Sequence, residues 1–498
     1  MKKILSASQM QQCDKNTIEN HGIPSLVLME RAALSVAIAI MSKFPEAINF
    51  YVVCGPGNNG GDGVAIARLL HLKGKNVNCA VLGDSSKYSK QLLEEIEIAK
   101  SYGIDIDYEV DFEMIKRSDL IVDAMFGIGL TRGLEGTYLA AADIINKALG
   151  KVVAVDIPSG YDSDTGKLLG DAGIKADLTI TFAYMKKGLV LGDCKAAAGD
   201  IEVADVGIYL DNIDPSLTTI IDDNIFSLIK PRPVDANKGT CGKLLVIAGS
   251  ENIYGACYLS AKAALVAGSG LVKIFTHKNN VASIQQNLPE AMYYGYDSFH
   301  EDELIKSMNW ADVILLGPGL GTNDVSKAIV DTILNQLNCP VIIDADGINL
   351  VAKKLDLLKE AARNIPVVLT PHLKEMERLT GINLNEIKYD IENVASNFAK
   401  EYNCTVILKD ATSIVATKKS VSYIISGNEG LATPGSGDVL AGIVASLVGQ
   451  KVNPDFGIIA CAAAHMHGLA GRHVSEVSGV RSVLASDIID EIKNLNKL

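Results

Sequence analysis

The 498-residue sequence is poor in aromatic residues, which make up 5% of the chain and include a single tryptophan. This scarcity argues against a nucleic-acid binder built on aromatic stacking platforms. Positive charge is also in deficit, because 46 lysines and arginines face 59 aspartates and glutamates and leave a net charge of −13. A net negative chain is unsuited to general binding of phosphate backbones or of an acidic membrane surface. We therefore expect neither a nucleic acid nor a membrane as a partner.

The nine cysteines include no CxxC pair, and their number is odd. This pattern argues against a disulfide framework and against a zinc site, and it predicts reduced thiols in a cytoplasmic protein. The first residues carry two lysines but only a short apolar stretch, so we expect no signal peptide. No uninterrupted apolar run approaches the roughly 18 residues of a membrane helix.

Short apolar segments alternate with helical patterns along most of the chain. The alternation predicts α/β architecture, with parallel sheets covered by helices on both faces. Residues 8–41 are predicted to form two helices, the first capped by Ser8 and the second starting at Pro24 and Ser25. Helices are also expected at 64–72, 88–102 and 138–149, and from Asp438 onward. Strands are expected at 49–54, 77–82, 120–123, 152–156, 243–248, 271–275, 313–316, 341–344, 367–370 and 405–409, with an antiparallel hairpin of 413–417 and 422–425.

The alternation pauses at residues 208–223, which lack a clear core period and contain a proline. We place the domain boundary there, which predicts an N-terminal domain of residues 1–215 and a C-terminal domain of residues 222–498. No internal repeat is detectable between the two halves.

The glycine-rich segment GPGNNGGDG, residues 55–63, follows a predicted strand and opens a helix. Backbone N–H groups at such a helix start favour an anion. The segment satisfies GxGxxG, and Asp84 follows downstream, which fits a dinucleotide site only weakly. It is not a P-loop, because Gly61 and Asp62 stand where lysine and serine or threonine are required. A plain tight turn is the alternative, but the polar side chains of Asn58, Asn59 and Asp62 favour a binding site.

Asp123 and Asp156 each end an apolar strand. In an open parallel sheet, ligands bind outside the carboxyl ends of the strands, so these carboxylates and the glycine-rich segment are expected to converge on one pocket. A carboxylate there could act as a base, hold a hydroxyl or bind a cation. Each aspartate could instead cap the segment that follows it. Residues 127–133, which include Arg132, could offer N–H groups and one positive charge to a phosphate.

Three stretches, LSASQMQQCDKNTIENHGIPSLVLMERAA, VVCGPGNNGGDGVAIARLL and VVAVDIPSGYDSDTG, resemble the epimerase domain of the NAD(P)H-hydrate repair enzymes. The resemblance covers most of residues 1–210 and implies a Rossmann-like three-layer domain that binds a damaged nicotinamide dinucleotide. It implies potassium ligands at Asn59, Asp123 and Ser159, with Asp123 and Asp156 as catalytic candidates. The substrate contacts that it implies are Asn58, Asn59, Gly60, Gly61, Asp62, Gly127, Ile128, Gly129, Leu130, Thr131, Arg132, Gly133 and Asp156.

In the second half, TPGSGDVLAGIVASLVGQ places Gly435, Ser436 and Gly437 before a helix that begins at Asp438. Unpaired N–H groups at the helix start can hold developing phosphoryl charge, and a carboxylate at the same turn can take the proton of an attacking hydroxyl. The alternative is an aspartate that only caps a core helix. His372 and Lys409 follow neighbouring predicted strands, where they could orient a substrate and reach nucleotide phosphates; either could instead be structural or solvated.

This half resembles the ribokinase-like dehydratase domain of the same repair family over most of residues 225–498. The resemblance implies substrate contacts at Ala256, Gly321, His372 and Asp438. It implies nucleotide contacts at Lys409, Asp410, Ala411, Thr412, Ser413 and Gly437. The sequence departs from the family pattern at Asn237, Leu373, Lys374, Asp410 and Pro434.

The resemblance as a whole implies a bifunctional enzyme for hydrated NADH and NADPH. The N-terminal domain would interconvert the R and S epimers, and the C-terminal domain would dehydrate the S epimer with ADP, giving AMP and phosphate. Magnesium is expected with the nucleotide phosphates, and the family resemblance favours a homo-oligomer. One alternative is a ribokinase-class vitamin kinase fused to a non-catalytic Rossmann-like binding domain, and a weaker one is an ordinary dehydrogenase.

Overall fold

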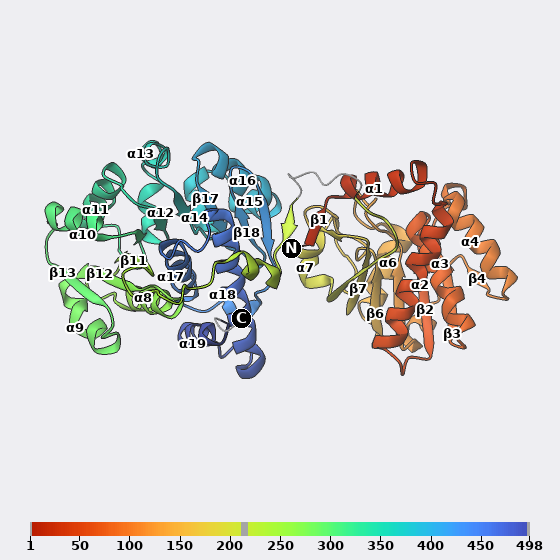
Figure 1. Ribbon diagram of the computed structural model, residues 1–498. Coiled ribbons are helices and arrows are strands. Elements are labelled where there is room, and N and C mark those ends of the chain that lie inside the picture. Colours follow the sequence, from red (N-terminus) through yellow and green to blue (C-terminus); the bar gives the residue numbers. More distant parts are fainter. Residues whose placement is uncertain (1, 211–217, 496–498) are drawn as a thin grey trace. The chain divides into compact units, whose positions relative to one another are not determined.

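The computed structural model describes residues 2–210 and 218–495. The chain divides into two compact units, Lys3–Leu217 and Thr218–Leu498 with Met1–Lys2, which we call the N-terminal and C-terminal units (Figure 1). Residues 211–217, in the middle of the predicted boundary segment, lie outside the described residues.

The N-terminal unit is built around a seven-stranded, fully parallel sheet in the order β4-β3-β2-β5-β6-β7-β9. Its strands are β2 (Asn49–Cys54), β3 (Asn76–Val81), β4 (Ile106–Asp107), β5 (Leu120–Ala124), β6 (Lys151–Val155), β7 (Leu178–Phe182) and β9 (Asp200–Ala204). A separate parallel pair joins β1 (Lys2–Leu5) to β8 (Met185–Lys186). The helices are α1 (Ala7–Glu19), α2 (Ser25–Lys43), α3 (Asn58–Leu72), α4 (Lys90–Ser101), α5 (Phe112–Arg117), α6 (Gly136–Ile145) and α7 (Cys194–Ala197).

Alternating side chains of β2 show why the sheet needs helices on both faces. Phe50, Val52 and Cys54 join a buried cluster with α2, α3 and α4, whereas Tyr51 and Val53 join one with α6. Successive residues of a strand point to opposite faces, so a strand that is apolar throughout must be covered on both sides. The predicted Rossmann-like three-layer arrangement is therefore observed.

The start of the chain differs from the prediction. Ser6, not Ser8, caps the first helix: its hydroxyl accepts from the Gln9 N–H at 3.2 Å, and the Gln9 side chain accepts from the Ser6 N–H at 2.9 Å. This reciprocal arrangement is a capping box, and it needs the glutamine three residues after the cap. Ser8 lies inside α1. Similarly, α3 starts at Asn58, six residues before the predicted start, because the second half of the glycine-rich segment is helical.

Helix α2 is long and apolar enough to cross a membrane by length and composition alone, with a mean hydropathy of 1.6. In the structure it packs against α3, and eight of its residues, including Ala33, Val36 and Ile40, are buried in the core of the unit. A buried core helix of a globular domain has the same composition, so this helix is accounted for by the fold.

The C-terminal unit contains a ten-stranded sheet in the order β13-β12-β11-β14-β15-β16-β17-β18-β19-β10. The strands are β10 (Thr219–Ile220), β11 (Lys243–Ile247), β12 (Leu271–His277), β13 (Met292–Tyr296), β14 (Val313–Leu316), β15 (Val341–Ile343), β16 (Val367–Leu369), β17 (Thr405–Leu408), β18 (Ser413–Ala416) and β19 (Val421–Ile424). All neighbours are parallel except β18, which runs antiparallel to β17 and β19, so the predicted hairpin is present.

The helices of this unit are α8 (Gly255–Val266), α9 (Lys278–Asn287), α10 (Glu301–Trp310), α11 (Asp324–Asn335), α12 (Asp346–Val351), α13 (Leu355–Ala361), α14 (Leu373–Thr380), α15 (Leu384–Tyr389), α16 (Ile391–Glu401), α17 (Ser436–Gly449), α18 (Phe456–Ser478) and α19 (Ala485–Leu495). Helix α17 is buried along nearly its whole length between α8 and α18. Its burial fixes the position of its first turn, which carries Asp438.

Candidate active sites

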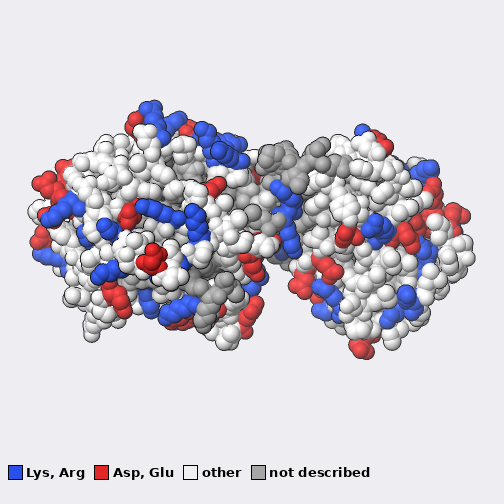
Figure 2. All heavy atoms as spheres, viewed as in Figure 1, with Lys and Arg blue, Asp and Glu red and all other residues white. Residues whose placement is uncertain are grey.

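Basic and acidic side chains both occur on each unit in the face shown in Figure 2. All nine cysteines are buried free thiols. No group of three or more His, Cys, Asp or Glu side chains suited to a metal ion occurs among the described residues. The two candidate sites lie at the strand ends at which the sequence predicts functional residues.

In the N-terminal unit, Asp123 lies in β5 and is fully buried. Its carboxylate accepts hydrogen bonds from the Ser159 hydroxyl at 2.7 Å, the Ser159 N–H at 2.8 Å and the Met125 N–H at 3.2 Å. Burial raises the pKa of Asp123 to about 6, although these hydrogen bonds oppose the shift. The structure thus brings Asp123 and Ser159 together, and a single negative charge there would have only neutral partners.

Asp156 follows β6 in a left-handed conformation, with φ of 68°. Its Oδ1 accepts from Lys186 Nζ at 2.6 Å and from Thr181 Oγ1 at 3.0 Å. Lys186 is 1% exposed, and its ammonium also donates to Thr181 Oγ1 and to the Phe182 carbonyl, both at 2.9 Å. The ammonium therefore has three fixed acceptors. The sequence reasoning did not identify Lys186, which lies on the two-residue strand β8.

Asn59 lies in the first turn of α3, close to the loop after β5. A Cβ atom on Gly127 would lie 3.2 Å from Asn59 Oδ1 and 3.1 Å from Asp156 Oδ2, so a larger residue here would crowd these two polar groups. The amide nitrogen of Asn59 is buried and has no hydrogen-bond partner among the described residues. A buried donor without a partner is costly, which indicates that a ligand completes this site.

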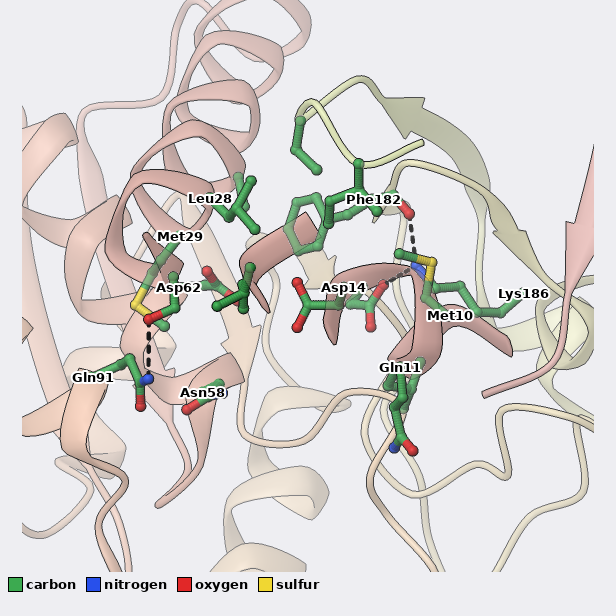
Figure 3. A pocket seen from close by; sticks show the side chains of 17 residues that line it. Met10, Gln11, Asp14, Leu28, Met29, Asn58, Asp62, Gln91, Phe182 and Lys186 are labelled. Atoms are coloured by element: carbon green, nitrogen blue, oxygen red, sulfur yellow. Dashed lines mark hydrogen bonds and ion pairs between the residues drawn. The ribbon is translucent and has the colours of Figure 1, made fainter. Parts of the chain in front are cut away.

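A cavity of about 210 Å³ opens beside these groups (Figure 3). Four predicted substrate contacts line it: Asn58, Asp62, Ile128 and Asp156. The other lining residues are Met10, Gln11, Asp14, Ile18, Ser25, Leu28, Met29, Ala32, Gln91, Phe182, Lys186, Val206 and Ile208. Gly60 and Gly61 are instead buried inside α3, and residues 129–133 do not line the cavity.

The cavity wall contributed by α1 was not predicted to be functional. Met10, Asp14 and Ile18 are spaced four residues apart and so share one helix face, with a carboxylate between two apolar side chains. Burial raises the pKa of Asp14. Burial also raises the pKa of Asp62 far above its ordinary value, and the nearby carboxylates of Asp156, Glu95 and Asp14 add to the shift.

In the C-terminal unit, a partly buried lysine pairs with a buried aspartate at strand ends. Lys409 Nζ lies 2.9 Å from Asp344 Oδ1, which also accepts from the Thr370 hydroxyl at 2.7 Å. Burial opposes the charge of Lys409, but the carboxylates of Asp344 and Glu375 more than compensate and raise its pKa. A Cβ atom on Gly437 would lie 3.2 Å from Lys409 Nζ, so the start of α17 faces this ammonium directly.

Asp438 occupies the first turn of α17, after Gly435 in a left-handed conformation with φ of 86°. Burial raises the pKa of Asp438 to about 7, the charge of Asp344 adds to the shift, and that of Lys409 opposes it. A base works best when its pKa lies near the operating pH. Asp438 therefore combines a suitable pKa with free helix N–H groups on the same turn. It does not cap the helix, because no side-chain cap is present.

His372 has a structural contact that the sequence did not reveal. Its Nδ1 accepts from the Glu375 N–H at 3.2 Å, and Glu375 Oε2 accepts from the His372 N–H at 2.9 Å, which caps α14. The side chain of His372 is 48% exposed and remains accessible to a ligand. Burial raises the pKa of Glu375 to about 7, with Lys409 opposing the shift.

The remaining predicted contacts border the same strand ends. The Gly321 N–H donates to Asp346 Oδ2 at 2.9 Å, and the loop 317–321 approaches Ala256 closely, because a Cβ atom on Gly319 would lie 3.2 Å from that of Ala256. Asp410, Ala411 and Thr412 connect β17 to β18, and Ser413 begins β18. Sequence reasoning also missed the Ser436 hydroxyl, which lies 3.1 Å from Nε2 of the buried His467.

The departures from the family pattern lie around these elements. Asn237 is exposed and accepts from the Gly239 N–H at 2.9 Å, so it organises its own turn. Leu373 and Lys374 form the first turn of α14, and Pro434 is exposed before α17. None of these side chains separates Lys409 from the first turn of α17.

The two folds and their strand-end sites define a two-domain enzyme of the α/β class, with a Rossmann-like unit and a kinase-like unit. Two family models match the chain accordingly: the YjeF-related protein N-terminus over residues 25–188 and NAD(P)H-hydrate dehydratase over residues 244–494.

Curated relatives match the chain from end to end. The bifunctional NAD(P)H-hydrate repair enzyme of Moorella thermoacetica is 34% identical over 98% of this chain and 95% of its own, and that of Escherichia coli K12 is 33% identical over 98% and 93%. The chain belongs to the family of bifunctional NAD(P)H-hydrate repair enzymes, which combine an epimerase with a dehydratase.

Solved structures resemble the C-terminal unit. A hypothetical protein from Streptococcus mutans is 32% identical, with a TM-score of 0.50 over 56% of this chain and 99% of that chain. A ribokinase-like superfamily protein from Enterococcus faecalis is 26% identical, with a TM-score of 0.50 over 58% and 98%. The predicted pair of a Rossmann-like and a ribokinase-like domain is thus confirmed, and the vitamin-kinase alternative is not favoured.

Proposed function

We propose that each unit performs one step in the repair of hydrated NADH and NADPH. The N-terminal unit interconverts the R and S epimers at the hydrated ring carbon, and the C-terminal unit dehydrates the S epimer. The observation that carries this proposal is that bifunctional repair enzymes match 98% of the chain, while each unit holds its own site with a lysine–aspartate ion pair.

In the C-terminal unit we propose ADP as the co-substrate and Asp438 as the base. Asp438 takes the proton of the ring hydroxyl while the hydroxyl oxygen bonds to the terminal phosphorus of ADP. The bond between that phosphorus and the bridging oxygen breaks, and AMP leaves. The ring nitrogen then uses its lone pair to expel phosphate, and loss of a proton from the adjacent carbon restores the double bond. Lys409 and the N–H groups of α17 hold the transferring phosphoryl group. Gly437 and residues 410–413 border the nucleotide, and Ala256, Gly321 and His372 border the substrate.

Magnesium suits this step because it binds nucleotide phosphates with few protein ligands. Asp344 and Asp346 lie near the same strand ends, and their carboxylates would be the groups to hold the hydrated ion. When bound, the ion neutralises phosphate charge; the protein's own contribution is to position the hydroxyl and accept its proton.

In the N-terminal unit we propose Asn59, Asp123 and Ser159 as ligands of a potassium ion. The donor set fits a hard cation, because it offers carboxylate, amide and hydroxyl oxygens. Among the described residues no lysine or arginine pairs with the buried carboxylate of Asp123, so a cation would supply the missing opposite charge. Asn58, Asp62, Ile128 and Asp156, which line the cavity, are proposed to contact the substrate, with Asp156 acting on the hydrated carbon.

We also propose a homo-oligomer in the cytoplasm. Helix α2 exposes Val27, Leu34 and Ile38 by 46%, 43% and 53%, and these side chains lie on its outer face. Light scattering after size-exclusion chromatography measures the mass, and a monomer would contradict this proposal.

The function is tested with purified hydrate epimers. S-NADPH hydrate plus ADP should regain the absorbance of the reduced nicotinamide ring and release AMP and phosphate. R hydrate should regain the absorbance only after the N-terminal unit has converted it to S hydrate. Asp438→Asn, which disables the dehydratase, should therefore still convert R hydrate to S hydrate. A folded, nucleotide-binding protein that leaves the S hydrate unchanged would refute the proposal; a stable phosphorylated vitamin as product would favour a kinase.

A further inference from the structure

Asp14 projects from α1 into the cavity of the N-terminal unit. In Figure 3 its carboxylate lies between Asp62, which comes from α3, and Lys186, which comes from β8. Helix α1 is not part of the sheet whose strand ends carry Asp123 and Asp156. It contributes a separate wall, made by Met10, Asp14 and Ile18.

The carboxylate of Asp14 has no hydrogen bond or ion pair with any residue in the described part of the chain, although the side chain is half-buried. Asp156 differs, because Lys186 and Thr181 occupy one of its oxygens. An unpartnered carboxyl on an otherwise apolar stripe is unfavourable for folding. Its position facing the cavity is explained if it acts on whatever enters.

Inversion at the hydrated ring carbon sets a clear requirement. The carbon–oxygen bond must break on one face, with a proton given to the departing hydroxyl so that it leaves as water. The ring nitrogen supplies the electron pair and becomes a positively charged, planar iminium. A water molecule then adds to the other face and gives up a proton, so atoms and charge balance and no cofactor is consumed. The site therefore needs a proton donor and a proton acceptor on two sides of the ring.

We propose that Asp14 is a catalytic acid–base residue of the epimerase, acting from the α1 wall of the cavity, while Asp156 acts from the wall that follows β6. This inference rests on the proposed function of the N-terminal unit. In one direction the carboxyl of Asp14 protonates the departing hydroxyl while Asp156 accepts the proton of the incoming water. In the other direction the two residues exchange roles, as a reversible epimerisation demands.

The surrounding charges suit this role. In the described lining of the cavity, Asp14, Asp62 and Asp156 face one cation, Lys186, so carboxyl groups are in excess around the place where the iminium charge forms. Burial raises the pKa of Asp14, which helps it to carry a proton before the reaction. The apolar neighbours Met10, Leu28 and Phe182 keep bulk water away from the ring.

The test uses the full chain and pure R-NADPH hydrate without ADP, with the two epimers separated by chromatography. Asp14→Asn keeps the shape of the side chain but cannot exchange a proton, so epimerisation should fall by about 100-fold or more in kcat. Glu19→Gln, which removes an exposed carboxylate from the same helix, should stay within about two-fold of the unmodified protein. ADP-dependent dehydration of S hydrate, performed by the other unit, should be unchanged in both variants.

Asp14→Ala allows a second measurement, chemical rescue, that distinguishes a catalytic residue from a merely structural one. Because Asp14 is half-buried, formate can reach the space that the substitution leaves, and added formate should restore part of the lost rate. Retention of kcat by Asp14→Asn, or a change confined to KM, would overturn the inference. Loss of activity without rescue by formate would also overturn it. An unmodified protein that dehydrates S hydrate but never epimerises R hydrate would instead refute the proposed function of the unit.

Discussion

The buried pair of Lys186 and Asp156 allows a quantitative prediction about stability. Lys186→Met keeps an apolar chain of similar length but leaves Asp156 buried without its cation. Removal of one partner of a buried ion pair costs about 3–5 kcal/mol, because the remaining charge is uncompensated. Three acceptors hold the ammonium at 2.6, 2.9 and 2.9 Å, so we expect a loss of unfolding free energy within this range. For a domain with an m-value of about 2–3 kcal/mol/M in urea, the midpoint should fall by about 1–2.5 M.

The chain provides its own reporter for the assay. Its single tryptophan, Trp310, lies in α10 of the C-terminal unit. Tryptophan fluorescence therefore follows the C-terminal unit alone, whereas far-ultraviolet circular dichroism follows both units. Lys186→Met should shift only a transition seen by circular dichroism and leave the fluorescence transition in place.

Two further variants decide whether the buried charge is the cause. Lys151→Met removes a surface lysine that lies 2.7 Å from Asp177, and it should cost no more than about 1 kcal/mol. Lys186→Met combined with Asp156→Asn removes both charges and should recover most of the stability lost in the single variant. A loss below about 1 kcal/mol for Lys186→Met, or no recovery in the double variant, would refute the reasoning.

Three other predictions concern the two activities. The pKa of Asp438 is raised to about 7 and the base must be unprotonated, so kcat/KM of the dehydratase should fall about tenfold for each pH unit below 7 and level off above it. Asp438→Asn should remove this pH dependence and lower the rate by about 100-fold or more. A pH profile that Asp438→Asn leaves unchanged would contradict the assignment of Asp438 as the base. His467→Leu should deprive the Ser436 hydroxyl of its hydrogen-bond partner and lower the ADP-dependent rate several-fold. Ser478→Ala, at the far end of α18, should leave the rate unchanged. Equal rates in the unmodified protein and both variants would exclude a role for the contact between Ser436 and His467. Replacement of potassium by a bulky organic cation should slow epimerisation of R hydrate and leave dehydration of S hydrate unchanged; loss of both activities would place the ion elsewhere.

The sequence predicted the strand-end carboxylates because their signal is local. Asp123 and Asp156 follow unbroken apolar runs, and topology alone places such residues at one edge of a parallel sheet. Lys186, the partner of Asp156, gives no such signal, since it lies 30 residues after Asp156 on a two-residue strand without periodicity. Its burial results from tertiary packing.

Other differences also come from contacts that short-range patterns do not specify. The helix cap at Ser6 depends on reciprocal hydrogen bonds with Gln9. Ser8 was predicted as the cap only because serine is preferred at the N-cap position. The early start of α3 was missed because glycines at 60, 61 and 63 lower helix propensity, yet tertiary packing holds them in the helix. Asp14 had a detectable signal, namely a carboxylate within the apolar spacing of Met10 and Ile18, but a structure was needed to show that this face borders a cavity.

The two sites reach a similar electrostatic arrangement on different folds. Each pairs one aspartate with a lysine, Asp156 with Lys186 and Asp344 with Lys409, and in each unit a second carboxyl has no cation of its own among the described residues. Burial and the charge of the paired aspartate then raise the pKa of the second carboxyl, Asp62 in one unit and Asp438 in the other. Both proposed reactions break the same carbon–oxygen bond with the help of the ring nitrogen. The feature that distinguishes them is the phosphoryl-binding helix start at Ser436–Gly449, which lies in the unit that is proposed to consume ADP.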